Sequence, residues 1–282
     1  MRHAWFVVNY LIDSYDEIIF DLDGVLYVGK SEVRWAVESV IRVAESGRGI
    51  WYATNNASRR ASDVAAHLSS LGFPVKKEQV ITSADVTAEV VARTFPHQSR
   101  IRVVGSPALT ESLVGAGLRI ANDTEPADIV IQGHSPDTNW ALLTRALRDL
   151  VAGAAWVATN TDSTLPLPEG IGLGNGSFVQ ALSHASERVP DVVVGKPHRP
   201  MFEVIAKSLP QGTRFLMIGD RCDTDMAWAH RCGVDGLLLD TGIDRIADTA
   251  KLSTPGQVPR WIGPDLRCLF DKPHEFSHGA LA

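Results

Sequence analysis

The chain has 282 residues, of which 45% are apolar and 21% are charged, and its net charge at neutral pH is −6. This length and composition are typical of a globular protein with one large or two moderate domains. The acidic balance, without a cluster of Lys and Arg, argues against nucleic acid as a partner.

Cysteine usage and hydropathy bear on the compartment. The three cysteines, Cys222, Cys232 and Cys268, are an odd number without metal-ligand spacing, so we expect reduced thiols in a cytoplasmic protein. The apolar run from Trp5 to Ile12 is too short to span a bilayer and contains Asn9. We therefore expect no membrane association.

The first candidate site follows a short apolar run, residues 18–20, which is typical of a strand buried on both faces. Asp21 and Asp23 come directly after it, and Gly24 allows a sharp turn. Two carboxylates at the end of a buried strand repel each other, so the pattern favours a cation between them, and Mg²⁺ prefers such oxygen ligands. The alternative is that Asp-x-Asp-Gly is only a turn after a strand.

A second candidate site follows a predicted helix over residues 33–46. Residues 49–53 read as another buried strand, which would deliver Thr54, Asn55 and Asn56 to the same carboxyl edge of a parallel sheet as Asp21. The helix predicted over 58–70 would place its amino end beside Thr54, where backbone N–H groups favour a phosphate. The alternative is that Thr54 and Ser58 only cap that helix.

A strand over residues 79–83 closes the first part of the core, and a further α/β unit begins at about residue 85. It is long enough to form a small domain. Its predicted helices cover 87–93, 108–116 and 139–151, and its predicted strands cover 101–105, 129–131 and 155–158.

The core resumes at about residue 189. Lys196 lies between a glycine and a proline after the predicted strand 191–194, where few turns would carry its side chain to open water. Asp220 directly follows the strand 214–218, and Asp225 would open a helix over 226–231. A helix over 201–209, a strand over 237–240 and a loop-rich tail with Pro255, Pro259 and Pro264 complete this part.

Four segments of the chain, taken in order, resemble the four motifs of the haloacid dehalogenase superfamily: residues 21–26, 53–58, 195–197 and 219–225. The α/β unit between the second and third motifs is similar to the cap of the type IIA branch, which includes NagD-like proteins and para-nitrophenylphosphatases. Relatives usually have Pro-Gly where Arg34-Trp35 stand here, which alters only a helix entry.

The resemblance implies an α/β fold: a doubly wound, Rossmann-like parallel-sheet core, residues 1–84 and 189–282, with an inserted α/β cap, residues 85–188. It implies Mg²⁺-dependent hydrolysis of a small phosphomonoester through an aspartyl phosphate on Asp21. The implied catalytic residues are Asp21, Asp23, Thr54 and Lys196; the phosphate-binding residues are Thr54, Asn55, Asn56 and Lys196; the metal ligands are Asp21, Asp23 by its main-chain carbonyl, and Asp220, with Asp225 holding a metal-bound water.

The resemblance leaves the substrate open among sugar phosphates, glycerol phosphate, phosphoglycolate, pyridoxal phosphate and nucleotides. It also leaves the oligomeric state open, although relatives with this cap are often homodimers. The cap segments 133–137, 158–162 and 172–177 are similar to cap stretches of that branch and could face a substrate, although turns and helix caps account for most such residues.

Three other activities fit the pattern less well. Dehalogenation needs neither a metal nor a second acid, yet Asp23, Asp220 and Asp225 are present. A phosphomutase would more often carry a small helical cap between the first two motifs, which only residues 27–52 separate here. A module that binds a phosphorylated ligand without turnover is disfavoured because every catalytic position is intact.

Overall fold

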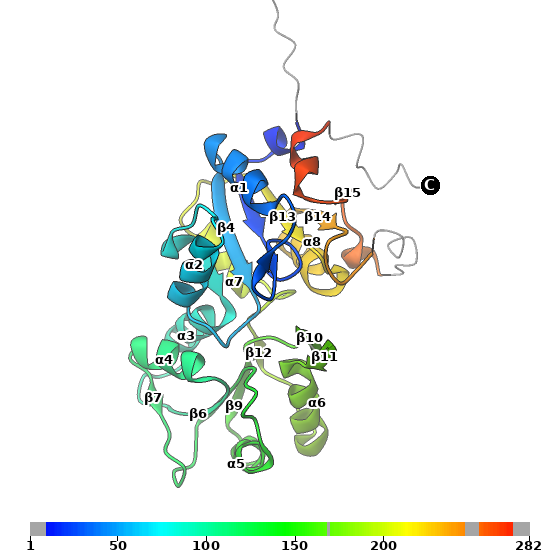
Figure 1. The fold of residues 1–282 in the computed structure, drawn as a ribbon. Helices are drawn as coiled ribbons and strands as arrows, with labels where there is room; N and C mark the ends of the chain where they lie inside the picture. The colour runs from blue at the N-terminus through cyan, green and yellow to red at the C-terminus, as the bar shows by residue number, and fades with distance from the viewer. Residues whose placement is uncertain (1–9, 168–169, 246–253, 273–282) are drawn as a thin grey trace, which may run out of the picture. The chain divides into compact units, whose positions relative to one another are not determined.

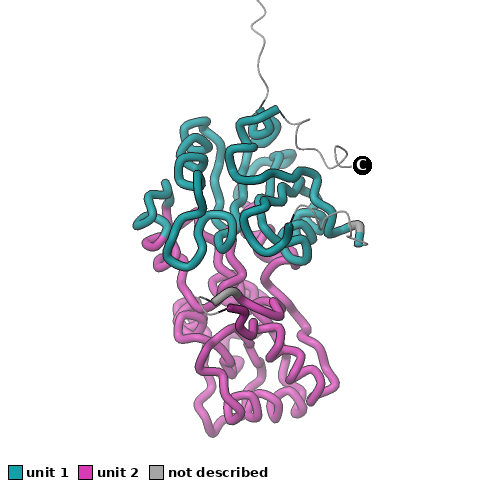
Figure 2. The backbone as a smooth tube through the Cα atoms, turned by 45° about the vertical axis from the view of Figure 1, so that its right-hand side comes forward, with its two compact units in different colours: residues 1–52, 68–75, 208–282 teal, residues 53–67, 76–207 magenta. Residues whose placement is uncertain are grey.

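The structure is a computed structural model that describes residues 10–167, 170–245 and 254–272. The chain divides into two compact units, which Figure 2 shows in different colours. The first contains residues 1–52, 68–75 and 208–282, and the second contains residues 53–67 and 76–207. Residues 5–9 of the N-terminal apolar run lie outside the described residues.

The first unit is built on parallel strands in the order β15-β14-β13-β1-β4 (Figure 1). Ile18, Ile19 and Phe20 of the central strand β1 are all fully buried. A strand with neighbours on both sides and both faces covered requires this continuous apolar run. The elements are β1 (Glu17–Phe20), β2 (Tyr27–Val28), β3 (Ser31–Glu32), α1 (Ala36–Glu45), β4 (Gly49–Thr54), β13 (Phe215–Gly219), α8 (Ala227–Cys232), β14 (Asp235–Leu239) and β15 (Trp261–Gly263).

The second unit has its own parallel sheet, with strand order β12-β9-β8-β6-β7, and an antiparallel hairpin β10-β11. Helix α3 packs on α4, and α5 packs on α6. The elements are β5 (Val80–Thr82), α3 (Ser83–Thr94), β6 (Arg100–Val104), α4 (Pro107–Gly115), β7 (Arg119–Ile120), β8 (Ile129–Gln132), α5 (Trp140–Val151), β9 (Ala155–Ala158), β10 (Thr164–Leu167), β11 (Gly170–Leu173), α6 (Asn175–Ser186), β12 (Val192–Val193) and α7 (Pro200–Ala206). Helix α2 (Ala61–Ser70) runs across the division between the units.

The core of the second unit surrounds Trp156 of β9, which is fully buried among Val104, Val130, Leu150 and Val179. Burying such a side chain contributes roughly 1.5–3 kcal/mol or more. Its indole Nε1 donates a hydrogen bond to Gln132 Oε1 at 3.1 Å, so the polar end of the ring is paired inside the core.

The parallel α/β architecture predicted from the sequence is confirmed. The short strands β2, β3, β7, β10, β11 and β15 were not predicted, because two to four residues are too few to show an apolar period. Helix α3 begins at Ser83 rather than near residue 87, because Thr82 Oγ1 accepts a hydrogen bond from the main-chain N–H of Asp85 at 3.1 Å. The predicted cap, residues 85–188, lies within the second unit, and its boundaries stay a prediction.

Trp35 stands where relatives usually have the glycine of a Pro-Gly pair, and it has a left-handed backbone with φ of 69°. Glycine adopts this conformation freely, whereas another residue is strained by roughly 1–3 kcal/mol. The guanidinium groups of Arg34 and Arg267 lie over its indole ring, at 4.7 and 5.0 Å from the ring centroid. These contacts offset part of the strain.

Within the described ranges, every helix is too short or too polar to cross a membrane.

Candidate active site

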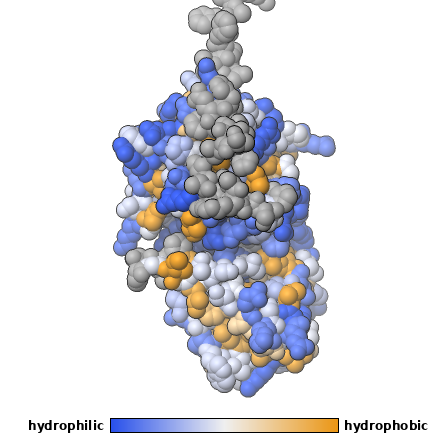
Figure 3. Space-filling view, turned by 90° about the vertical axis from the view of Figure 1, so that its right-hand side faces the viewer, coloured by the Kyte–Doolittle hydropathy of each residue, from blue (hydrophilic) through white to orange (hydrophobic). Residues whose placement is uncertain are grey.

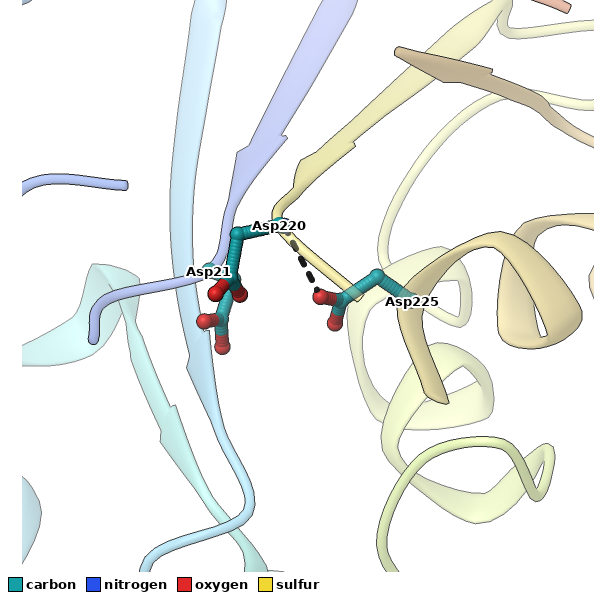
Figure 4. Close-up of side chains that lie close together, drawn as sticks. All are labelled: Asp21, Asp220 and Asp225. Atoms are coloured by element: carbon teal, nitrogen blue, oxygen red, sulfur yellow. Dashed lines mark hydrogen bonds between the residues drawn. The ribbon is translucent and has the colours of Figure 1, made fainter. Parts of the chain in front are cut away.

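Three carboxylates gather in the first unit. Asp21, Asp220 and Asp225 each offer one oxygen atom, and these atoms all lie within 4.8 Å of one another (Figure 4). Asp220 and Asp225 are 2% and 1% exposed, and Asp21 is half-buried. The family resemblance implied that Asp21 and Asp220 bind the same metal ion. It implied that Asp225 holds a water bound to that ion.

The sheet brings Asp21 and Asp220 together. Strands β1 and β13 are parallel, with Phe20 paired to Ile218, and each aspartate follows the carboxyl end of its strand. Asp225 comes from a single helical turn, Cys222–Met226, just after β13. Its Oδ2 accepts hydrogen bonds from the main-chain N–H groups of Asp220 and Arg221, both at 3.2 Å, which hold the carboxylate toward the cluster.

A loop that follows β14 encloses Asp220. The main-chain N–H of Ile243 donates to Asp220 Oδ2 at 2.8 Å, and Thr241 Oγ1 donates to the carbonyl of Gly24 at 2.6 Å. A Cβ atom at Gly242 would collide with the Asp220 carboxylate, so only glycine fits there. The sequence analysis missed this loop, although Asp240, Thr241 and Gly242 follow a buried strand as the recognised motifs do.

The cluster fits a hard divalent cation. Two unit charges 4.8 Å apart repel each other by roughly 3.5 kcal/mol at an effective dielectric constant of 20, less where solvent screens Asp21. A divalent cation would replace this repulsion by attraction, and an all-oxygen donor set suits Mg²⁺. Asp23 is outside the cluster: it is half-buried and forms an isolated bridge with Tyr27.

The other predicted residues belong to the second unit. Thr54 is the last residue of β4, and its Oγ1 accepts a hydrogen bond from the main-chain N–H of Asn56 at 3.0 Å. Asn56 Oδ1 in turn accepts from the main-chain N–H of Ser58 at 2.8 Å. Helix α2 begins later than predicted, at Ala61, whose N–H donates to Asp85. Thr54 thus shapes a tight turn and does not cap the helix.

Lys196 is buried in the second unit, with 2% exposure. Its ammonium Nζ donates to the carbonyl of Ala53 at 3.2 Å. Its main-chain N–H and carbonyl both bond to the side chain of Asn55, at 2.7 and 2.9 Å. A buried ammonium group is costly unless it is compensated by acceptors or by an anion, so this lysine is not a solvated surface charge.

Two asparagines that the sequence analysis did not single out join Asn55. Asn160 Nδ2 donates to the Asn55 carbonyl at 2.7 Å, and Asn175 Nδ2 donates to the Asn160 carbonyl at 2.7 Å. All three are buried. Asn160 and Asn175 lie in two of the three cap segments that the sequence offered as substrate-facing loops. Their polarity suggested loops that could face a substrate, but the sequence did not indicate that both side chains are buried.

The third of those segments contains His134, which follows β8. Burial lowers the pKa of its imidazole, because charging the ring in a desolvated site is unfavourable. Its Nδ1 is buried and has no hydrogen-bond partner among the described residues.

Two family models match the chain. The model described as haloacid dehalogenase-like hydrolase matches residues 18–119, and a HAD-hydrolase-like model matches residues 193–269. D-glycerol 3-phosphate phosphatase of Mycobacterium tuberculosis is 38% identical over 261 residues, which cover 92% of this chain and 72% of the relative. Human chronophin is 34% identical over 257 residues, covering 85% and 86% of the two chains.

Solved structures agree with these matches. A glycerol phosphate phosphatase from M. tuberculosis, in complex with magnesium, has a TM-score of 0.88 at 36% identity and covers 96% of this chain and 81% of its own. A p-nitrophenyl phosphatase from Archaeoglobus fulgidus has a TM-score of 0.83 at 28% identity, with coverage of 91% and 98%. The chain belongs to the haloacid dehalogenase-like hydrolase family, in the type IIA branch of phosphatases.

Proposed function

We propose that the protein is a Mg²⁺-dependent phosphatase that hydrolyses a small phosphomonoester through a phosphorylated Asp21. The cluster of Asp21, Asp220 and Asp225 is the observation that carries this proposal. Its donor set suits Mg²⁺, and the proposed nucleophile is one of its members. The similar phosphatase solved in complex with magnesium supports the same assignment.

In the proposed mechanism, Asp21 attacks phosphorus while the bond to the leaving oxygen breaks, and this forms an aspartyl phosphate. Asp23 donates a proton to the leaving oxygen. Asp23 then takes a proton from the water that attacks the intermediate, which releases inorganic phosphate and restores Asp21. Two moderate steps replace one very slow displacement.

Asp21, Asp220 and the main-chain carbonyl of Asp23 would hold Mg²⁺, and Asp225 would orient a water bound to it. When bound, the ion neutralises charge on the phosphoryl oxygens. Thr54, Lys196 and the main-chain N–H groups of Asn55 and Asn56 would bind the phosphoryl group. Their roles rest on the order of the four motifs.

The decisive experiment is phosphate release from para-nitrophenyl phosphate by the purified protein, with Mg²⁺ and then with excess chelator. Turnover that needs both the metal and Asp21 supports the proposal. A protein that binds phosphate esters but releases none, under both conditions, would instead be a binding module.

Glycerol 3-phosphate is the first physiological ester that we propose, because relatives named for glycerol phosphate match across most of the chain. A panel that also includes phosphoglycolate, sugar phosphates, pyridoxal phosphate and nucleotides tests this choice. A kcat/KM for another ester at least ten times higher would overturn it.

A cytoplasmic location and a homodimer stay predictions.

The number of subunits bears on the exposed apolar residues of the second unit. It exposes the large apolar side chains of Trp140, Ile171 and Leu173. On the face that Figure 3 shows, apolar side chains lie among polar ones. Light scattering on the purified protein would measure the number of subunits.

A further inference from the structure

The side chain of Asn55 pairs with both main-chain polar groups of Lys196. Asn55 Oδ1 accepts from the Lys196 N–H at 2.7 Å, and Asn55 Nδ2 donates to the Lys196 carbonyl at 2.9 Å. One planar amide therefore fixes the position of the backbone of Lys196 from a segment 141 residues earlier in the chain.

Asp162 determines which way this amide faces. Asn55 Nδ2 lies 3.1 Å from both Asp162 Oδ1 and Asp162 Oδ2. An ionised carboxylate only accepts hydrogen bonds, so it must face the NH₂ group of Asn55. The reversed amide would place Oδ1 against the carboxylate and NH₂ against the Lys196 N–H, and would lose all of these bonds.

The backbone of Asn55 is held as firmly as its side chain. Its carbonyl accepts hydrogen bonds from Ser83 Oγ at 2.6 Å and from Asn160 Nδ2 at 2.7 Å, and both donors are buried. A Cβ atom at Gly195 would lie 2.7 Å from Asn55 Oδ1, so the residue before Lys196 must be glycine for this approach. Both polar atoms of the Asn55 side chain thus have hydrogen-bond partners within the protein.

We propose that Asn55 is a positioning residue that acts through Lys196, and that Asp162 keeps its amide in the required orientation. The proposal rests on the proposed function, in which Lys196 contacts the phosphoryl group. It refines the expectation that Asn55 binds phosphate, because only its main-chain N–H is assigned that contact. By holding the backbone of Lys196, the Asn55 side chain sets the point from which the lysine side chain extends.

The first test is Asn55→Asp, which keeps the acceptor for the Lys196 N–H. It replaces the Nδ2 donor by an oxygen that faces the Lys196 carbonyl and the Asp162 carboxylate, which both only accept hydrogen bonds. With para-nitrophenyl phosphate we expect kcat to fall by about 10²-fold, the usual cost of a small misplacement, while KM changes by less than about threefold. The matched control is Asn139→Asp, which is expected to keep wild-type kcat, because Asn139 caps α5 and aspartate caps equally well.

The second test asks whether Asn55 acts through Lys196. In a Lys196→Ala background, Asn55→Asp should cost less than about threefold in kcat, because the group that it positions is gone. A further loss of about 10²-fold in that background would overturn the proposal, since Asn55 would then contact the substrate or support the fold independently. Wild-type kcat for Asn55→Asp alone would also overturn it.

The third test exchanges the two side chains. In Asn55→Asp/Asp162→Asn, the new amide at 162 can donate to the new carboxylate at 55, although the bond to the Lys196 carbonyl stays lost. We expect the double variant to regain at least about tenfold of the kcat lost in Asn55→Asp. A double variant no faster than Asn55→Asp would overturn the role of Asp162.

A measurement without turnover separates this proposal from the proposed function. Amide hydrogen exchange in residues 194–198 should become at least about tenfold faster in Asn55→Ala, and it should not change in Asn139→Ala. If the wild-type protein releases no phosphate, the proposed function fails while this exchange still tests the positioning. Unchanged exchange in Asn55→Ala would overturn the positioning, whatever the activity.

Discussion

The acidic cluster of the first unit and an asparagine network in the second unit, Asn55 with Asn160, both bury polar groups, but they balance donors and acceptors differently. The carboxylates of Asp21, Asp220 and Asp225 are all acceptors, so no one of these side chains can donate a hydrogen bond to another when they are ionised. Asn55 and Asn160 each carry donors and acceptors that meet complementary partners. An excess of acceptors suits a cation, whereas paired donors and acceptors suit a group that supports its neighbours.

This difference predicts opposite effects on stability. Removing one charge from the cluster relieves repulsion when no cation is bound, whereas changing a member of the network leaves a buried group unpaired. Burial alone does not separate the two regions, since Asp220 is 2% exposed and Asn160 is 4% exposed.

Asp21→Asn should have the largest effect on activity. Loss of a nucleophile is expected to lower kcat by roughly 10⁴-fold or more, with no phosphoryl group on the protein. Without metal the same variant should unfold at a higher temperature than the wild type, because one of three crowded charges is gone. Stopped-assay kinetics and a thermal melt in chelator measure both. A labelled phosphoprotein from this variant would exclude Asp21 as the nucleophile.

Asp23→Asn should separate the two chemical steps, because Asp23 lies outside the acidic cluster. With para-nitrophenyl phosphate, whose leaving group departs without an acid, we expect a burst of about one nitrophenolate per site and then turnover lowered by ~10²–10⁴-fold. With an alkyl phosphate the burst should disappear. Rapid mixing with both esters checks this, and normal turnover of both would contradict the role of Asp23.

A buried ion pair shows that the second unit also compensates full charges. Arg102 Nε donates to Asp149 Oδ2 at 2.8 Å, and both side chains are less than a tenth exposed. Asp149 Oδ1 also accepts from the Ala127 N–H at 3.0 Å. Asp149→Asn should lower the free energy of unfolding by ~3–5 kcal/mol, because it leaves the buried guanidinium charge of Arg102 without the carboxylate that neutralises it.

Asp128→Asn is the matched control for that experiment. Hydrogen bonds from Arg100 lower the pKa of Asp128 to about 2, but this pair is exposed to solvent. Solvent screening makes an exposed pair contribute little, so this variant should be far more stable than Asp149→Asn. Urea denaturation of both variants measures the contrast, and equal losses would contradict it.

Metal binding should stabilise the wild type by a smaller amount. At a Mg²⁺ concentration 100 times its Kd, the free energy of unfolding should rise by about 2.7 kcal/mol, because the ion binds only the folded cluster. Asp220→Asn should lose most of this gain, whereas Asn139→Asp should keep it. Full turnover in excess chelator would show that the cluster does not hold the essential cation.

The sequence predicted the parallel α/β architecture, because buried parallel strands are continuous apolar runs with polar residues at their carboxyl ends. The roles of the residues at those strand ends stay predictions. It did not predict the loop around Ile243 or the partners of Asn55. Asn160 lies 105 residues from Asn55 along the chain, and no local period or propensity reports such a hydrogen bond. Polar residues that support a site therefore look the same in the sequence as residues that touch a ligand.

His134 is an exception to the pairing of donors and acceptors in the second unit. It is a titratable group whose buried Nδ1 has no hydrogen-bond partner among the described residues. Burial lowers the pKa of its imidazole below the ordinary value of about 6.5. The unfolded chain therefore binds more protons than the folded chain near pH 6, so stability is full above about pH 6.5 and is lost as the pH falls below it. In His134→Gln the free energy of unfolding should fall less steeply as the pH is lowered. The change in slope should correspond to less than one bound proton.

Urea denaturation at several pH values between 5 and 8 measures that slope, and His97→Gln, at an exposed histidine, controls for the substitution itself. The effect is expected to be the smallest of the five, because His134 is only half-buried and solvent supports part of its charge. An unchanged slope in His134→Gln would show that the ring finds a partner when it is protonated. In that case the second unit would balance its donors and acceptors at this position too, and the contrast with the acidic cluster would be sharper.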